Sequence, residues 1–128
     1  MQKIQTAEIM KKYNALFLEE RGFTFEYFQE KGGDSSCVYI CRFKKGKDYF
    51  DLREPSGKYE LNLMVYAGGQ YVFPILKLLY PKECKAFKRK HFFSRATIND
   101  HRLFMAELLE KEWQNDKPDF FGIPKNRS

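Results

Sequence analysis

The chain has 128 residues, of which 43% are hydrophobic and 17% aromatic, so it can fold as a single domain and is not an intrinsically disordered segment. It contains no apolar run of about 18 residues and no signal peptide, so we expect a cytoplasmic protein without membrane insertion. The net charge is +6, and residues 67–95 carry all of it, with seven bases and one acid. Such a local positive charge predicts an anionic partner.

The first two predicted elements are a helix and a strand. Residues 6–20 repeat apolar side chains at helical spacing, with Thr6 as a candidate N-cap and Gly22 just after the end. Apolar residues then alternate with polar ones, which indicates a short strand over 23–28.

A meander of three more strands is predicted over 37–43, 48–53 and 58–66. The segments 45–46 and 54–57 contain glycine or proline at positions that fit tight turns. These turns place one set of side chains on a common face, expected to be the core side: Tyr39, Cys41, Phe43, Phe50, Leu52, Tyr59 and Leu61. The opposite face is mixed, and we expect the C-terminal tail to cover part of it: Val38, Ile40, Arg42, Tyr49, Asp51, Arg53, Lys58, Glu60, Asn62, Met64 and Tyr66.

The turn positions also predict cross-strand neighbours. Cys41 should lie opposite Phe50, Phe50 opposite Leu61, and Asp51 opposite Glu60. Two carboxylates on directly opposite positions of neighbouring strands could act as general acid and base or hold Mg²⁺. On an open sheet face water screens such charges, so we interpret the pair as solvated and compensated by neighbouring arginine or lysine.

Two short helices are predicted next. Pro81 disfavours helical angles at Tyr80, so one helix is expected within the apolar segment 71–80 and another over 81–91.

The C-terminal part is expected to form the longest helix and a tail. Thr97 and Asp100 resemble a capping arrangement for a helix over 98–114. Residues 116–128 form a proline-containing tail, whose apolar residues should pack back on the domain.

Together these elements predict one α+β domain over 1–128. It has an N-terminal helix, a four-stranded antiparallel meander sheet, two short helices and a longer C-terminal helix. The helices 6–20 and 98–114 should pack on the aromatic face of the sheet.

A helical wheel separates the side chains of 81–91 into two sides. Lys82, Lys85 and Arg89 fall together. The opposite side holds Tyr80, Cys84, Phe87 and His91. Residues 92–93, two phenylalanines, would fall among the lysines if the helix continued, so it should end near His91.

The sequence contains no recognisable catalytic or cofactor motif, so we predict no cofactor and no metal. His91 and His101 are separated by a helix break, and Cys84 stands about 10 Å from His91 along one helix. Cys37 and Cys41 lie about 13 Å apart in one strand, too far for a disulfide. We interpret all three cysteines as ordinary reduced side chains.

These observations predict a non-enzymatic binding module that contacts an acidic protein surface through the basic helix. The candidate site residues are Lys82, Lys85, Lys88, Arg89 and Lys90. The alternative is sequence-tolerant nucleic-acid binding by the same helix, with Arg42, Tyr49 and Arg53 of the sheet face as a weaker second set. An enzyme would need an enclosed pocket around the histidines or the carboxylate pair. The oligomeric state stays open.

Overall fold

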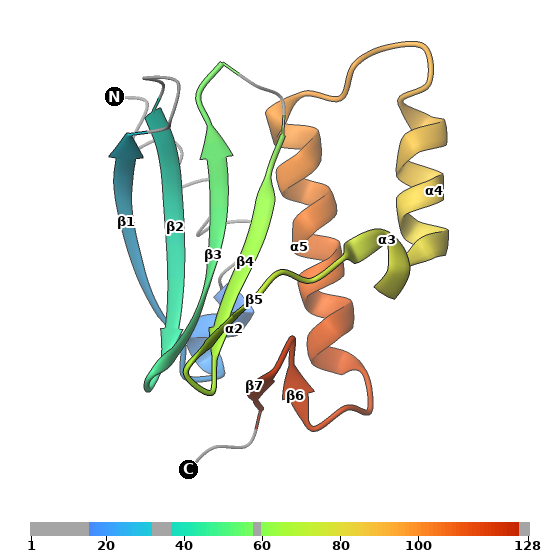
Figure 1. Cartoon of the computed structure of the whole chain (residues 1–128). Coiled ribbons are helices and arrows are strands. Elements are labelled where there is room, and N and C mark those ends of the chain that lie inside the picture. Colours follow the sequence, from blue (N-terminus) through green and yellow to red (C-terminus); the bar gives the residue numbers. More distant parts are fainter. Residues whose placement is uncertain (1–15, 32–36, 58–59, 126–128) are drawn as a thin grey trace.

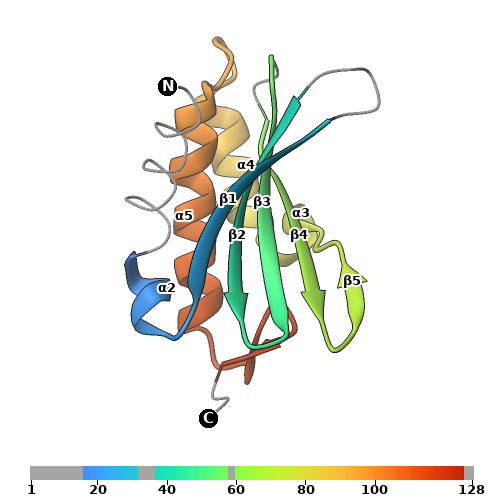
Figure 2. The same cartoon turned by 90° about the vertical axis from the view of Figure 1, so that its left-hand side faces the viewer.

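The computed structural model describes residues 16–31, 37–57 and 60–125 and confirms the α+β class (Figure 1). The strands are β1 (Thr24–Lys31), β2 (Cys37–Lys45), β3 (Asp48–Pro55), β4 (Asn62–Ala67), β5 (Gln70–Val72), β6 (Asp119–Phe120) and β7 (Ile123–Pro124). The helices are α2 (Leu16–Glu20), α3 (Leu76–Leu79), α4 (Pro81–Lys90) and α5 (Ile98–Gln114). Helices α2 and α5 lie on one side of the main sheet, and α4 lies beyond α5 (Figures 1 and 2).

The antiparallel sheet has five strands, in the order β1-β2-β3-β4-β5, rather than the predicted four. Gly68 and Gly69 have φ values of 60° and 80°, as in a type I′ hairpin loop. This loop pairs Ala67 with Gln70, and β5 adds three residues at the sheet edge. The prediction missed β5 because so short a strand shows no alternation of side chains.

The register of β2 against β3 differs from the prediction by two residues. Gly46 and Lys47 form the loop, so Cys41 lies opposite Leu52 and not opposite Phe50. Gly46 has a φ of 65° at the first loop position, where type II′ hairpins require glycine. A shift of two residues leaves side chains on their predicted faces, because the period of a strand is two.

The register of β3 against β4 differs from the prediction by four residues. Phe50 lies opposite Val65, not opposite Leu61. Strand β3 does not turn at Glu54 but stays paired with β2 up to Pro55, and Glu54 is bound by an arginine of α5. That contact joins residues far apart in the chain, so local turn signals could not reveal it. Residues 58–59, including the predicted core residue Tyr59, lie outside the described part.

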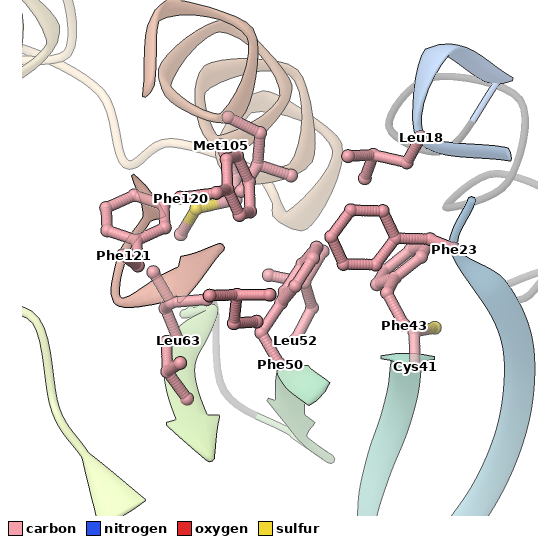
Figure 3. Packing of buried hydrophobic residues seen from close by; sticks show 13 residues of the cluster. Leu18, Phe23, Cys41, Phe43, Phe50, Leu52, Leu63, Met105, Phe120 and Phe121 are labelled. Atoms are coloured by element: carbon pink, nitrogen blue, oxygen red, sulfur yellow. The ribbon is translucent and has the colours of Figure 1, made fainter. Parts of the chain in front are cut away.

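The hydrophobic core lies between the predicted aromatic face of the sheet and α5 (Figure 3). Phe43 and Phe50 stack there with ring centroids 4.8 Å apart. Met105 and Leu109 of α5 belong to the same buried cluster. Burying each such side chain contributes about 1.5–3 kcal/mol, so this layer supplies most of the apolar stabilisation.

The C-terminal tail packs on its own domain, as predicted, but on the opposite face from the one expected. Phe120 is fully buried and its ring lies 5.3 Å from Phe50 and 6.0 Å from Phe23. Both partners point to the core face, so the expectation that the tail covers the mixed face is wrong. The aromatic side chains of the tail complete the core because the largest apolar surface is there.

The described helices agree with the predicted boundaries in the second half of the chain. Helix α5 spans Ile98–Gln114 and has a capping box: the Thr97 hydroxyl accepts from the Asp100 amide, and the Asp100 carboxylate accepts from the Thr97 amide. The break at Pro81 separates α3 from α4 as expected. The predicted first helix, 6–20, lies mostly outside the described residues.

No helix in the described part of the chain is long and apolar enough to cross a bilayer. The three cysteines are free thiols, with Cys41 buried, Cys84 half-buried and Cys37 exposed.

A buried ion pair attaches α5 to the sheet. Arg102 donates to both carboxylate oxygens of Glu54, from Nε at 2.9 Å and from Nη2 at 2.7 Å. Both side chains are more than nine-tenths buried. This bidentate geometry fixes the position of α5 along β3.

Replacing Arg102 with methionine should lower the free energy of unfolding by about 3–5 kcal/mol, because the Glu54 carboxylate would stay buried without its counter-charge. Urea titration measures the effect. The double variant E54M/R102M should recover most of the loss, since neither charge is then buried. A double variant no more stable than R102M would contradict this account.

Candidate binding surface

Helix α4 presents its basic side chains to solvent and its apolar side to α5. The predicted site residues Lys82, Lys85, Lys88, Arg89 and Lys90 are all exposed. On the other side of the helix, the Phe87 ring stacks on Phe104 of α5 at 4.4 Å. The helix therefore lies on the outside of the molecule as an oriented cationic surface (Figure 1).

The single acid of the basic segment is used in a contact with α5. Glu83 accepts a hydrogen bond from Lys111 at 3.0 Å, and this lysine lowers the pKa of the Glu83 carboxyl. Within the described residues, no ion pair involves Lys85, Lys88 or Arg89. The charges of these three bases are therefore not neutralised by an ion pair within the described residues.

A buried carboxylate holds the start of α4 in place. The Tyr80 hydroxyl donates to Glu112 of α5 at 2.6 Å, and the Phe121 amide donates to the other oxygen at 2.9 Å. Burial first, and then the bond to Glu112, raises the pKa of Tyr80. The junction between α3 and α4 is thus tied to α5 and to the C-terminal hairpin.

An apolar surface adjoins the N-terminal end of α4. Five side chains of β5, α3 and the segment between them are exposed: Val72, Phe73, Ile75, Leu78 and Leu79. Leu78 is 71% exposed and Phe73 67%. Four of the five line an open groove of about 480 Å³ between this segment and the C-terminal hairpin, where Phe121 also contributes. Exposed apolar area of this kind indicates a contact site.

A second apolar feature lies at the other end of α4. Phe92 is 76% exposed and Phe93 is 96% exposed in the loop that leads to α5. This loop and the C-terminal hairpin lie at opposite ends of the molecule in both views (Figures 1 and 2). In the sequence, only the helical wheel indicated that these two residues would be exposed, because it put both of them on the lysine side of the helix.

The sheet residues of the weaker predicted site make a structural cluster on the face opposite the core. Arg42 donates to both oxygens of Asp51, at 2.7 and 2.9 Å, and Asp51 is fully buried. The guanidinium lies over the rings of Tyr49 at 3.9 Å and Phe28 at 4.8 Å. The bond to Asp51 raises the pKa of Arg42.

The predicted pair of Asp51 with Glu60 is wrong. Asp51 lies opposite Met64 on β4 and opposite Arg42 on β2, while Glu60 is exposed outside the strands. The cause is the register shift, which moved the arginine rather than a second acid next to Asp51. The cluster is a neutralised ion pair without the geometry of two carboxylates that share a proton.

The residues of the weaker predicted site are already engaged in contacts within the sheet. The Tyr49 ring lies between Arg42 on β2 and Tyr66 on β4, which stacks on it at 5.1 Å. A nucleic-acid base could stack on Tyr49 only by displacing one of them. Arg53 is paired with Glu30 at 3.2 Å.

The two predicted sets of site residues do not form one surface. Helix α4 lies beyond α5 from the sheet (Figure 1), and Arg42 belongs to the sheet face opposite the core residues Cys41 and Phe43. A single ligand that contacts both sets would have to pass around the domain.

The two histidines are closer than the sequence suggested. His91 and His101 contact the same Phe87 ring, at 4.7 and 5.2 Å, and His91 lines an open groove of about 450 Å³ with Asp100. Burial lowers the pKa of His101, His91 lowers it further, and Asp100 and Glu60 oppose the shift. Among the described residues no group of His, Cys, Asp or Glu could hold a metal ion.

No protein-family model, curated protein or solved structure matches this chain.

The stability of the fold should fall as the pH is lowered from about 7.5 to 5.5, because the folded chain resists protonation of His101 below its ordinary pKa of 6.5 while the unfolded chain accepts it. The variant H101Q should lose less stability over the same range. Thermal unfolding at both pH values measures the difference. An identical pH dependence in H101Q would show that His101 does not carry the effect.

Proposed function

We propose that this protein is a non-enzymatic binding module that holds an acidic protein partner on the basic side of α4. The observation that carries the proposal is the unbalanced charge of that side, where Lys85, Lys88 and Arg89 have no ion-pair partner among the described residues. Cations held close together on a rigid helix repel one another until an anionic surface neutralises them.

The apolar surface beside α4 supports a protein as the partner. A protein interface combines a buried apolar centre with a polar or charged rim. Leu78 and Leu79 precede Lys82 by only a few residues, and α3 packs directly on α4. A partner that carries apolar side chains next to carboxylates would satisfy both features, whereas a phosphate backbone would leave the apolar surface in water.

Nucleic-acid binding remains the alternative function. The cationic side of α4 supports it, but the paired arginines and the covered ring of Tyr49 on the sheet face do not. A reducing, cytoplasmic location agrees with the three free cysteines.

The variant K82E/K85E/R89E tests the proposal. Tagged wild-type and variant chains are used to capture proteins from nuclease-treated lysate of the source cells, and the bound proteins are quantified. We expect the variant to lose the partner by more than about 100-fold, because reversing several interface charges costs several kcal/mol. The control K31E/K44E/K47E makes the same total charge change on three exposed lysines of the sheet and its turn, and should retain the partner.

Two outcomes would contradict the proposal. Equal loss in both variants would mean that net charge rather than the α4 surface matters. Capture from untreated lysate that is absent from the nuclease-treated lysate would favour nucleic acid, together with binding of a single-stranded oligonucleotide that weakens by about 0.7 log units per log unit of salt for each phosphate.

A further inference from the structure

We propose that the end of α4 and the loop after it also bind the surface of an anionic lipid bilayer. This membrane tip consists of Lys88, Arg89, Lys90, Phe92 and Phe93. The two rings would lie among the headgroups while the bases contact lipid phosphates and carboxylates. The proposal adds a second contact to the proposed function and involves no membrane-spanning segment.

The exposure of the two phenylalanines is the first argument. Phe93 is 96% exposed, so its ring contributes almost no burial to the folded state. Its ring contact is with Phe92, edge to face at 4.9 Å. Two adjacent exposed aromatic rings form a compact apolar wedge, and transfer out of water favours such a wedge.

The charge around the wedge is the second argument. Lys88, Arg89 and Lys90 follow one another in the last turn of α4, and all three are exposed. Each base held near an anionic membrane strengthens binding about fivefold at room temperature. A bilayer surface has two layers, charged headgroups and the apolar chains below them. The bases of the tip suit the headgroups, and the aromatic rings suit the boundary with the apolar chains.

The shape of the tip favours a bilayer over a soluble acidic protein. Phe92 and Phe93 belong to the loop at one end of the molecule (Figure 1), and they line neither the groove with His91 nor the groove beside α3. A protein would need a concave apolar pocket to receive them, whereas a bilayer deforms around them. The apolar side of α4 is used against α5 through Phe87, so only the tip, and not the whole helix, can enter the headgroup layer.

The tip and the proposed protein site share Lys88 and Arg89 but differ in their apolar parts. The groove beside α3 lies near the N-terminal end of α4, and the tip lies at its C-terminal end (Figure 1). Lys82, Lys85 and the groove stay outside the tip, so an acidic protein and a bilayer compete only for Lys88 and Arg89. Two rings and three bases give weak, reversible attachment.

Co-sedimentation of the full chain with lipid vesicles tests the proposal. The probes are vesicles of phosphatidylcholine alone and of phosphatidylcholine with about one third phosphatidylserine, to which a polybasic surface is attracted. The wild type should bind only the second kind. The variant F92S/F93S should bind them at least about tenfold more weakly, since it loses two aromatic rings. The variant K88Q/R89Q/K90Q should lose about 100-fold, from three bases at about fivefold each.

Two matched variants serve as controls. L78S removes an apolar side chain of α3 that is 71% exposed and lies near the other end of α4, and K31Q/K44Q/K47Q removes three exposed bases from the sheet side. The L78S variant should bind like the wild type, and the lysine control should lose far less than its counterpart in the tip. Because Phe92 and Phe93 are exposed, F92S/F93S should keep the melting temperature of the wild type, which thermal unfolding verifies.

Three results would overturn the proposal. The wild type fails to bind vesicles with phosphatidylserine, F92S/F93S binds them as well as the wild type, or L78S loses as much binding as F92S/F93S. If F92S/F93S instead loses the soluble partner captured by α4 while no variant binds vesicles, the tip belongs to the protein interface. The proposed function would survive that result.

Discussion

The Glu112 carboxylate is the interaction on which the arrangement of the outer elements depends. It is buried, and it accepts hydrogen bonds from the Tyr80 hydroxyl, the Phe121 amide and the Asn115 side chain. A buried charge without such donors costs several kcal/mol, so all three must reach it in the folded state. These donors come from the α3–α4 junction, the C-terminal hairpin and the end of α5. One carboxylate therefore sets where the basic helix begins and where the apolar groove lies.

Buried ion pairs join the layers of the molecule, whereas α4 carries a run of exposed bases. Arg102 and Glu54 join α5 to the core face of the sheet, while Arg42 and Asp51 join β2 to β3 on the opposite face. The described arginines of the sheet are paired, whereas Lys85, Lys88 and Arg89 of α4 have no ion-pair partner in the described part of the chain. This difference favours α4 over the sheet as the surface that binds an anionic partner. The apolar groove and the exposed phenylalanines lie at the two ends of this cationic helix.

Local signals predicted the helices of the second half well. The capping box of Thr97 and Asp100 and the break at Pro81 act within a few residues, so the boundaries of α4 and α5 could be derived from the sequence. The faces of the meander were also correct, because both register errors were even numbers of residues. The registers themselves were wrong, since they depend on the loop position of Gly46 and on the extension of β3 to Glu54. No residue near Glu54 in the sequence indicates that Arg102 binds it.

The sequence by itself determined the α+β class, the core face of the sheet and the cationic side of α4, because periodicity and charge are local properties. Only the tertiary structure decided which charges are neutralised and which apolar side chains are buried. Arg42 and Lys85 each lack a basic residue directly beside them in the sequence. In the structure Arg42 lies against the buried Asp51, whereas Lys85 is exposed to water. Phe120 and Phe93 are both members of phenylalanine pairs, yet one is fully buried and the other 96% exposed. The reason is physical: pairing and burial depend on residues that meet only after the chain has folded.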